Sequence, residues 1–293
     1  MSDRTHILWA DSTWNPVRGC SAVSEGCRNC FAKALVNGRL GGDFSQRVRA
    51  AKATFDAPLR WNKRPWVCDD CGGDTPAQDA EKAVWCSRCG DYASFHRRRV
   101  FLGSLMDIWD PKIPVHDLAD ALDIVRRCPE LRFLCLSKRP ELWKSRLRKV
   151  WLLYAVGNKS VQPELGLWVH RMMNGLENPT NNVWLGVSVE NQKAADERRE
   201  SFKAIPAVRK FVSYEPALED VNWSGWEFVN QIIFGGESGP HKRQCAPAWA
   251  QHTLEFCRSN DIAFFCKQDS HRFPGQQGRI PDDIFAIKQF PKD

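Results

Sequence analysis

The sequence has no apolar run long enough to cross a membrane, because a transmembrane helix needs about 20 consecutive apolar residues. Its first six residues also lack the basic and then apolar run of a secretory signal peptide. We therefore expect a cytoplasmic protein with no membrane partner.

The composition shows no bias toward a special class of protein. Hydrophobic residues make up 43% of the 293 residues and charged residues 26%, both ordinary values for a soluble globular chain. This length is enough to bury a sizeable core, and one α/β barrel would use most of it. The net charge of +7 favours a polyanionic partner, although many basic surfaces are simply solvated.

The twelve cysteines are more consistent with metal binding than with disulfide bonds. Seven of them form two groups with metal-like spacing, and the other five lie in apolar surroundings, as buried thiols usually do. This usage is typical of a reducing cytosol. The five scattered residues are Cys128, Cys135, Cys245, Cys257 and Cys266.

The first group, Cys20, Cys27 and Cys30, has C-x6-C-x2-C spacing and lacks an obvious fourth ligand. Structural zinc and ordinary iron–sulfur clusters both take four protein ligands. A [4Fe–4S] cluster held by three cysteines leaves one iron open, and such an iron can chelate the amine and carboxylate of S-adenosylmethionine (SAM). The alternative is a zinc site completed by a distant cysteine or histidine.

The second group, Cys68, Cys71, Cys86 and Cys89, forms two C-x2-C pairs, each followed by a glycine. Four thiolates at this spacing predict a closed zinc ribbon, with rubredoxin-like iron as the competing interpretation. The insert, residues 66–95, is poor in apolar residues, so we expect it to need its metal in order to fold. The run His96-Arg97-Arg98-Arg99 that follows suggests either a nucleic-acid contact or a solvated face.

From residue 100 onward, short apolar segments alternate with segments of helical periodicity. This alternation predicts successive buried strands of a parallel sheet separated by helices. The predicted fold class is α/β, a full or partial β/α (TIM-like) barrel over residues 1–293. It carries the zinc ribbon at 66–95 and, where the alternation is lost, a second insertion at 151–182. The predicted strands are 8–17, 100–105, 131–136, 183–187, 210–214, 231–234 and 262–266, and the predicted helices are 27–40, 115–125, 141–150, 191–203 and 247–259.

A short polar motif follows each predicted strand after residue 100. The carboxyl ends of the strands build the active site in β/α barrels, so these motifs are expected to meet at one mouth, beside the three cysteines. A single such residue is more often a cap or a surface ion pair, but six successive motifs favour a site. The motif residues are Ser104 and Asp107, Ser137-Lys138-Arg139, Ser188 and Glu190, Ser213 and Glu215, Gly235-Gly236-Glu237-Ser238, and Lys267-Gln268.

These motifs resemble those of a phage-associated family of radical-SAM-like proteins with a three-cysteine motif. The resemblance covers roughly residues 8–268, apart from the zinc insert and 151–182. The first cysteine gap is six residues here, whereas the wider radical SAM superfamily has three. The matching pieces are Thr13-Trp-Asn-Pro-Val-x-Gly-Cys20, Cys27-x-x-Cys30, Ser104-x-x-Asp107, Ser137-Lys-Arg-Pro140, Trp184-Leu-Gly-Val-Ser-Val-Glu190, Glu215-Pro216 and Gly235-Gly-Glu-Ser-Gly239.

The resemblance implies a [4Fe–4S] cluster on Cys20, Cys27 and Cys30 that cleaves SAM reductively to a 5′-deoxyadenosyl radical, which abstracts a hydrogen from the substrate. It also implies an electron donor such as flavodoxin or ferredoxin. With the basic charge and the ribbon, phage ancestry favours a nucleic acid as substrate, DNA above all. The reaction would be the modification or rearrangement of a base, such as thymine hypermodification by an isomerase, in the host cytoplasm if a phage encodes the chain.

The other site residues are assigned by the same resemblance. Ser104, Asp107, Ser188, Glu190 and Glu215 are the candidates for binding SAM. The candidates for the substrate are Lys138, Arg139, Lys267 and Glu237. The superfamily's Gly-Gly-Glu follows the second strand, whereas Glu237 follows a late one, so the superfamily's role is not carried over to it.

Two alternatives from other functional classes remain. One is a non-catalytic, zinc-dependent nucleic-acid-binding protein, which would contain no iron. The other is a cluster-free barrel hydrolase that uses Asp107, Glu190, Glu215 and Glu237 as paired acid and base.

Overall fold

The computed structural model describes residues 3–75, 84–157, 162–176 and 181–291. Its centre is a seven-stranded, entirely parallel sheet with the order β1-β9-β10-β11-β12-β13-β14. The predicted parallel α/β sheet is therefore confirmed. The strands are β1 (Ser12–Trp14), β9 (Arg99–Leu102), β10 (Arg132–Ser137), β11 (Val183–Ser188), β12 (Arg209–Tyr214), β13 (Gln231–Gly235) and β14 (Ala263–Gln268).

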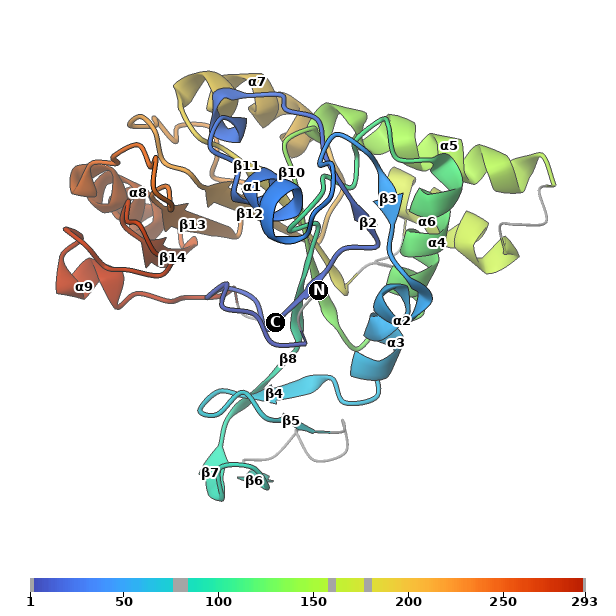
Figure 1. Ribbon diagram of the computed structural model, residues 1–293, viewed down its shortest axis with the longest axis horizontal. Helices are drawn as coiled ribbons and strands as arrows, with labels where there is room; N and C mark the ends of the chain where they lie inside the picture. Colours follow the sequence, from blue (N-terminus) through green and yellow to red (C-terminus); the bar gives the residue numbers. More distant parts are fainter. Residues whose placement is uncertain (1–2, 76–83, 158–161, 177–180, 292–293) are drawn as a thin grey trace.

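The sheet curves into a half-barrel that stays open, since β1 and β14 are its two edges and do not pair in the described part of the chain (Figure 1). One residue from each of six strands packs on one face of the sheet, under Trp9. Gly186 makes room in this layer, because a Cβ there would lie 2.1 Å from the ring of Phe211. The layer consists of Phe101, Leu134, Trp184, Phe211, Ile233 and Phe265.

Helices cover the other face of the sheet and bury the larger core cluster against it. The predicted helices near 115–125, 191–203 and 247–259 are confirmed within a few residues. The helix predicted at 141–150 begins and ends later, and a further helix follows it. The helices are α4 (Val115–Arg126), α5 (Trp143–Ala155), α6 (Pro163–Asn174), α7 (Gln192–Lys203), α8 (Pro247–Ser259) and the short α9 (Asp282–Phe285).

Residues 151–182, the predicted insertion, contain the end of α5 and all of α6 in the described part of the range, which omits 158–161 and 177–180. Leu165, Trp168 and Val169 of α6 are buried in the main core. The segment therefore packs as part of the body of the protein. None of the helices in the described ranges is long and apolar enough to cross a membrane.

The N-terminal segment is more broken than its sequence predicts. The helix predicted from Cys27 to Leu40 is three short elements, because Cys30 is extended (φ −58°, ψ 116°) and ends the first turn. The strand predicted at 8–17 is divided into β1 and β2. The short elements here are β2 (Val17–Arg18), η1 (Glu25–Cys27), α1 (Phe31–Ala34), the π-helical η2 (Leu35–Arg39), β3 (Val48–Arg49), α2 (Lys52–Phe55) and α3 (Ala57–Trp61).

The insert at residues 66–95, called the four-cysteine module below, consists of small antiparallel sheets. Its residues 76–83 lie outside the described residues. Because β8 leads directly into the amino end of β9, the module lies at the amino end of the parallel strands and extends away from the body (Figure 1). Its strands are β4 (Trp66–Cys68), β5 (Asp74–Thr75), β6 (Val84–Cys86) and β7 (Asp91–Ala93), and β8 (Phe95–Arg97), which starts at its last residue, pairs with β4.

Candidate active site

The three-cysteine segment, residues 20–30, lies at the carboxyl end of the sheet and is called the cysteine loop below. Directly before it stands Gly19, whose N–H donates to Leu105 O at 3.0 Å just beyond β9. The φ of Gly19 is +104°, and a Cβ there would lie 1.8 Å from Gln46 O. Only glycine fits this left-handed, crowded position, so Gly19 fixes where the loop leaves the sheet.

The first contact between the loop and the strand ends is made by Arg139, which follows β10 and is buried. Its guanidinium donates to Asp107 Oδ2 at 2.7 Å, to Ser21 O at 2.6 Å and to Cys20 Sγ at 3.7 Å. Asp107 also accepts from Ser137 Oγ at 2.7 Å. This network holds the Cys20 end of the loop against β9 and β10.

A second contact holds the middle of the loop to the end of β11. The fully buried Glu190 accepts hydrogen bonds from Ser24 Oγ of the loop, from Lys138 Nζ at 3.2 Å and from Arg198 Nη1 at 2.7 Å. Burial would raise the pKa of Glu190, but the positive charges of Lys138 and Arg198 lower it to about 2. Gly26 packs directly on this carboxylate, since a Cβ there would lie 2.9 Å from Oε1.

A third contact holds the last part of the loop to the segment that follows β13. Asn29 Nδ2 donates to Glu237 Oε2 at 2.9 Å and to His241 O at 2.8 Å. Arg243 donates to Glu237 Oε1 at 2.5 Å and to Glu25 O at 3.2 Å. Although burial would raise the pKa of Glu237, the hydrogen bonds from Arg243 and Asn29 lower it.

The thiols of Cys20, Cys27 and Cys30 are all half-buried. In the described ranges they do not form a group tight enough for one metal ion. Cys20 and Cys30 pack against the same small apolar cluster. Burial and Asp107 raise the pKa of Cys20 to about 11, while the pKa of Cys27 is lowered, against its burial, by hydrogen bonds from Val23 and Ser24 and by Lys138. In their chemistry, three partly enclosed cysteine thiols are the donors that an iron–sulfur cluster takes.

The predicted convergence at one mouth holds for five of the predicted site residues. Asp107, Lys138, Arg139, Glu190 and Glu237 all contact the cysteine loop or a residue that contacts it. We predicted that the carboxylates of this set, Asp107, Glu190 and Glu237, bind SAM or the substrate. In the structure, oxygens of all three accept hydrogen bonds from other residues of the protein.

Of the remaining predicted residues, only Ser188 touches this network, through its carbonyl oxygen, which accepts from Arg198 Nη1 at 2.8 Å. Ser104 Oγ accepts from Asn15 Nδ2 at 2.8 Å, and Ser188 is buried at the end of β11. Glu215 and Lys267 form an ion pair of 2.6 Å, and Trp9 Nε1 donates to Glu215 at 3.3 Å. These contacts make Glu215, directly after β12, and Lys267 of β14 a separate group.

Sequence reasoning missed several residues of the network, including Arg198, Arg243 and Asp110. Arg198 lies eight residues after its partner Glu190, on the helix that follows β11. Asp110 accepts from Arg47 Nη2 at 2.6 Å and from the Ser21 N–H at 3.0 Å. The sequence did carry one signal of contacts between the loop and its surroundings, the polar residue Asn29 between Cys27 and Cys30.

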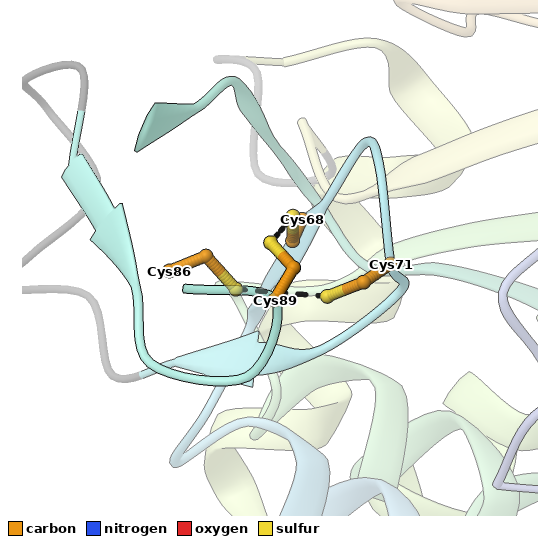
Figure 2. Close-up of side chains that lie close together, drawn as sticks. All are labelled: Cys68, Cys71, Cys86 and Cys89. Carbon is orange, nitrogen blue, oxygen red and sulfur yellow. Dashed lines mark hydrogen bonds between the residues drawn. The ribbon is translucent and has the colours of Figure 1, made fainter. Parts of the chain in front are cut away.

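The second cysteine group has the geometry of a mononuclear metal site (Figure 2). The ligand atoms of Cys68, Cys71, Cys86 and Cys89 all lie within 4.8 Å of one another, with Sγ–Sγ distances of 4.0 Å for Cys68–Cys89 and 3.6 Å for Cys71–Cys86. Four thiolates in a tetrahedron with Zn–S bonds of ~2.3 Å lie about 3.8 Å apart, so the donor set fits zinc.

The turns at this site also match the sequence expectation. The glycine after each cysteine pair has a left-handed backbone, with φ of +65° at Gly72 and +72° at Gly90. The N–H of Gly72 donates to Cys68 O at 2.9 Å, and the N–H of Gly90 donates to Cys86 O at 2.8 Å. These equivalent tight turns bring each pair of sulfurs to the same side of its loop.

In the basic run after the module, which suggested either a nucleic-acid contact or a solvated face, all three arginines form ion pairs within the protein. Arg97 pairs with Glu130 at 2.8 Å, and Arg99 pairs with Asp11 at 3.5 Å and lies over the ring of Phe290. Arg98 is buried and pairs with Asp74 at 2.8 Å. These arginines are therefore used for contacts inside the protein. Their acidic partners are distant in sequence, so these contacts could not be predicted from the run itself.

Fold and site together define an α/β half-barrel protein with a three-cysteine loop at its carboxyl-end mouth and a separate four-cysteine site. The chain belongs to the DUF5131 family, described as proteins of unknown function, whose family model matches residues 4–280. No curated protein and no solved structure gave a significant match.

Proposed function

We propose that this protein is a radical SAM enzyme that acts on a nucleic-acid base. The observation that carries the proposal is the position of the cysteine loop. Three half-buried thiols lie at the carboxyl end of a parallel half-barrel, where enzymes of barrel type place their chemistry. The four-cysteine site would hold zinc with a structural role.

Cys20, Cys27 and Cys30 would hold a [4Fe–4S] cluster. Reduced by a donor such as flavodoxin or ferredoxin, the cluster and SAM supply the radical chemistry that removes an unactivated hydrogen. The residues of this chain keep the loop in place. Arg139, Glu190 and Glu237 each hold one part of the loop, which is the pre-organisation that a reactive site requires.

The hydrolase alternative gains no support from the carboxylates. A general acid needs a pKa raised toward the working pH, whereas the pKa values of Glu190 and Glu237 are lowered by their cationic partners. Asp107 and Glu215 are paired with Arg139 and Lys267 at 2.7 and 2.6 Å. The non-catalytic alternative is distinguished by iron content.

The test is anaerobic purification followed by iron and sulfide analysis and an assay for reductive SAM cleavage to 5′-deoxyadenosine. The wild-type protein is expected to be brown, to bind about four irons at the loop and to form 5′-deoxyadenosine under reduction. Cys27→Ala should lose both properties. Cys257→Ala, which removes a buried thiol in α8, should keep them. Reconstituted wild-type protein with no visible charge-transfer absorption would refute the proposal.

A further inference from the structure

Beside the cysteine loop, three segments that are distant in sequence form one continuous surface. Asn29 Nδ2 donates to His241 O at 2.8 Å, which joins the loop to the segment after β13. The N–H of Gly239 donates to His271 O at 3.0 Å, which joins that segment to the one after β14. The surface therefore lies at the carboxyl end of the sheet, directly next to the cysteines.

The side chains on this surface are basic and aromatic. Arg28 and Arg272 are exposed, Lys242 is half-buried, and none of the three forms an ion pair with a residue that the structure describes. Phe273 has 60% of its surface exposed, and the guanidinium of Arg272 lies 5.9 Å from its ring centroid. Arg28, His241, Lys242, Arg272 and Phe273 are called the basic patch below.

The nearby carboxylates neutralise the basic patch only in part, because arginines already pair with them. Glu237 and Glu25 pair with Arg243 at 2.5 and 3.4 Å. Asp269 is buried and pairs with Arg279 at 2.9 Å. Two carboxylates share Arg243, which leaves one negative charge against the three positive charges of Arg28, Lys242 and Arg272, so the patch stays net positive. The arginines of the Arg97-Arg98-Arg99 run, in contrast, each pair with an acidic residue.

We infer that the basic patch binds a strand of nucleic acid in which the base next to the cysteine loop is unpaired. Phe273 offers an exposed ring for stacking on a base, and Arg28, Lys242 and Arg272 offer charges for the adjacent phosphates. Cationic grooves that carry exposed aromatic rings bind single strands in this way. A base presented for chemistry must leave the duplex stack, which agrees with an unpaired base at the mouth. The inference rests on the proposed function in one respect: it takes the mouth as the place where the reaction occurs.

The test is fluorescence anisotropy of a labelled single-stranded oligonucleotide with the full-length protein over a salt series. Phe273→Ala is expected to weaken binding by about 5- to 150-fold, the loss typical of one base–aromatic stack. The double variant Lys242→Ala/Arg272→Ala should reduce the salt slope by about 1.4, since each lost phosphate contact on a single strand contributes ~0.7.

Two matched controls make the result specific. Lys144→Ala/Arg148→Ala removes the same charge from the exposed face of α5, and Trp85→Ala removes an exposed ring from the four-cysteine module. Both should bind within about twofold of wild type, because a surface that lies outside the contact adds little. Equal losses in the controls, competition by polyglutamate as strong as that by unlabelled oligonucleotide, or absence of binding at low salt would overturn the inference.

The formation of 5′-deoxyadenosine without nucleic acid is measured on the same samples. SAM cleavage without oligonucleotide binding would refute the basic patch and leave the proposed function standing. Binding that depends on Phe273, in a protein that takes up no iron, would support the patch and refute the radical mechanism.

Discussion

Glu190 offers the sharpest test of how the cysteine loop is held. Its buried carboxylate accepts from Ser24 of the loop, from Lys138 at 3.2 Å and from Arg198 at 2.7 Å. Glu190→Gln keeps the size of the side chain but removes its charge. The two cations would then lack their counter-charge, and the amide would present a donor to side chains that are themselves donors.

The expected cost follows from burial. Removing one partner of a buried ion pair costs about 3–5 kcal/mol, because the other charge stays buried and unpaired. For 293 residues, ~2.1 cal/mol/K of unfolding entropy per residue amounts to about 0.6 kcal/mol/K. Glu190→Gln is therefore expected to lower Tm by about 5–8 °C.

The pH dependence of this effect has a definite sign. The pKa of Glu190 in the folded protein is about 2, below its ordinary value of 4.5, because of Lys138 and Arg198, which outweigh its burial. The stabilisation is thus fully present above pH 4.5 and is lost as the pH falls toward 2. The Tm difference between wild type and Glu190→Gln should be constant from pH 6 to 8 and should close below pH 4.5.

The measurement is thermal unfolding across this pH range, together with the rate at which iodoacetamide alkylates Cys27. Glu197→Gln is the control, since it breaks an exposed pair with Lys193 at 3.8 Å that is worth at most about 1 kcal/mol. Alkylation should be faster in Glu190→Gln than in the control. The anchoring role of Glu190 would be refuted if the Tm of Glu190→Gln lay within about 1 or 2 °C of that of Glu197→Gln and the alkylation rate were unchanged. A difference of this size is on the order of what the loss of a surface pair produces.

Three further predictions concern the four-cysteine module, the core and the loop. Cys68→Ser should release about one zinc per chain and unfold the module, while the half-barrel keeps its own cooperative transition; a full zinc complement by elemental analysis would contradict this. Burial lowers the pKa of Lys210 to about 8, so the unfolded state binds more protons between pH 8 and 10.5 and stability should rise with pH there. Lys210→Met should be more stable at pH 7, by at most about 3 kcal/mol in denaturant unfolding, and lose this advantage by pH 10.5. Gly26→Ala should loosen the loop and reduce iron retention, because its Cβ would lie 2.9 Å from Glu190, whereas Gly38→Ala meets no atom within 4 Å and should retain iron like wild type.

The strand and helix series was predictable because each buried strand is a continuous apolar run and each helix has one apolar face. Val183–Ser188 and Pro247–Ser259 are examples. Closure of the barrel was not predictable, since it depends on whether two edge strands, β1 and β14, meet in space. The broken helix after Cys27 was also missed, because the residues around Cys30 carry no glycine or proline that would mark the extended backbone found there.

The site was predictable in its cysteines and strand-end carboxylates, but not in what those carboxylates do. Glu190 and Glu237 accept hydrogen bonds from Arg198 and Arg243, which stand outside every motif. An ion pair of this kind depends on which helix faces which strand end, and spacing in the sequence does not reveal it.

The two cysteine sites lie at opposite ends of the parallel strands, and this separation divides their roles. Chemistry in barrel-type folds belongs to the carboxyl end of the strands, and residues at the amino end serve stability. At the amino end, buried Arg98 joins Asp74 of the four-cysteine module to Ser12 Oγ of β1 at 2.8 and 3.0 Å. The metal of the module would thus stabilise the edge strand from which the chain continues to Gly19 and the cysteine loop. On this argument the four-cysteine module acts on the mouth only through the position of β1, and a nucleic acid at the mouth need not touch it.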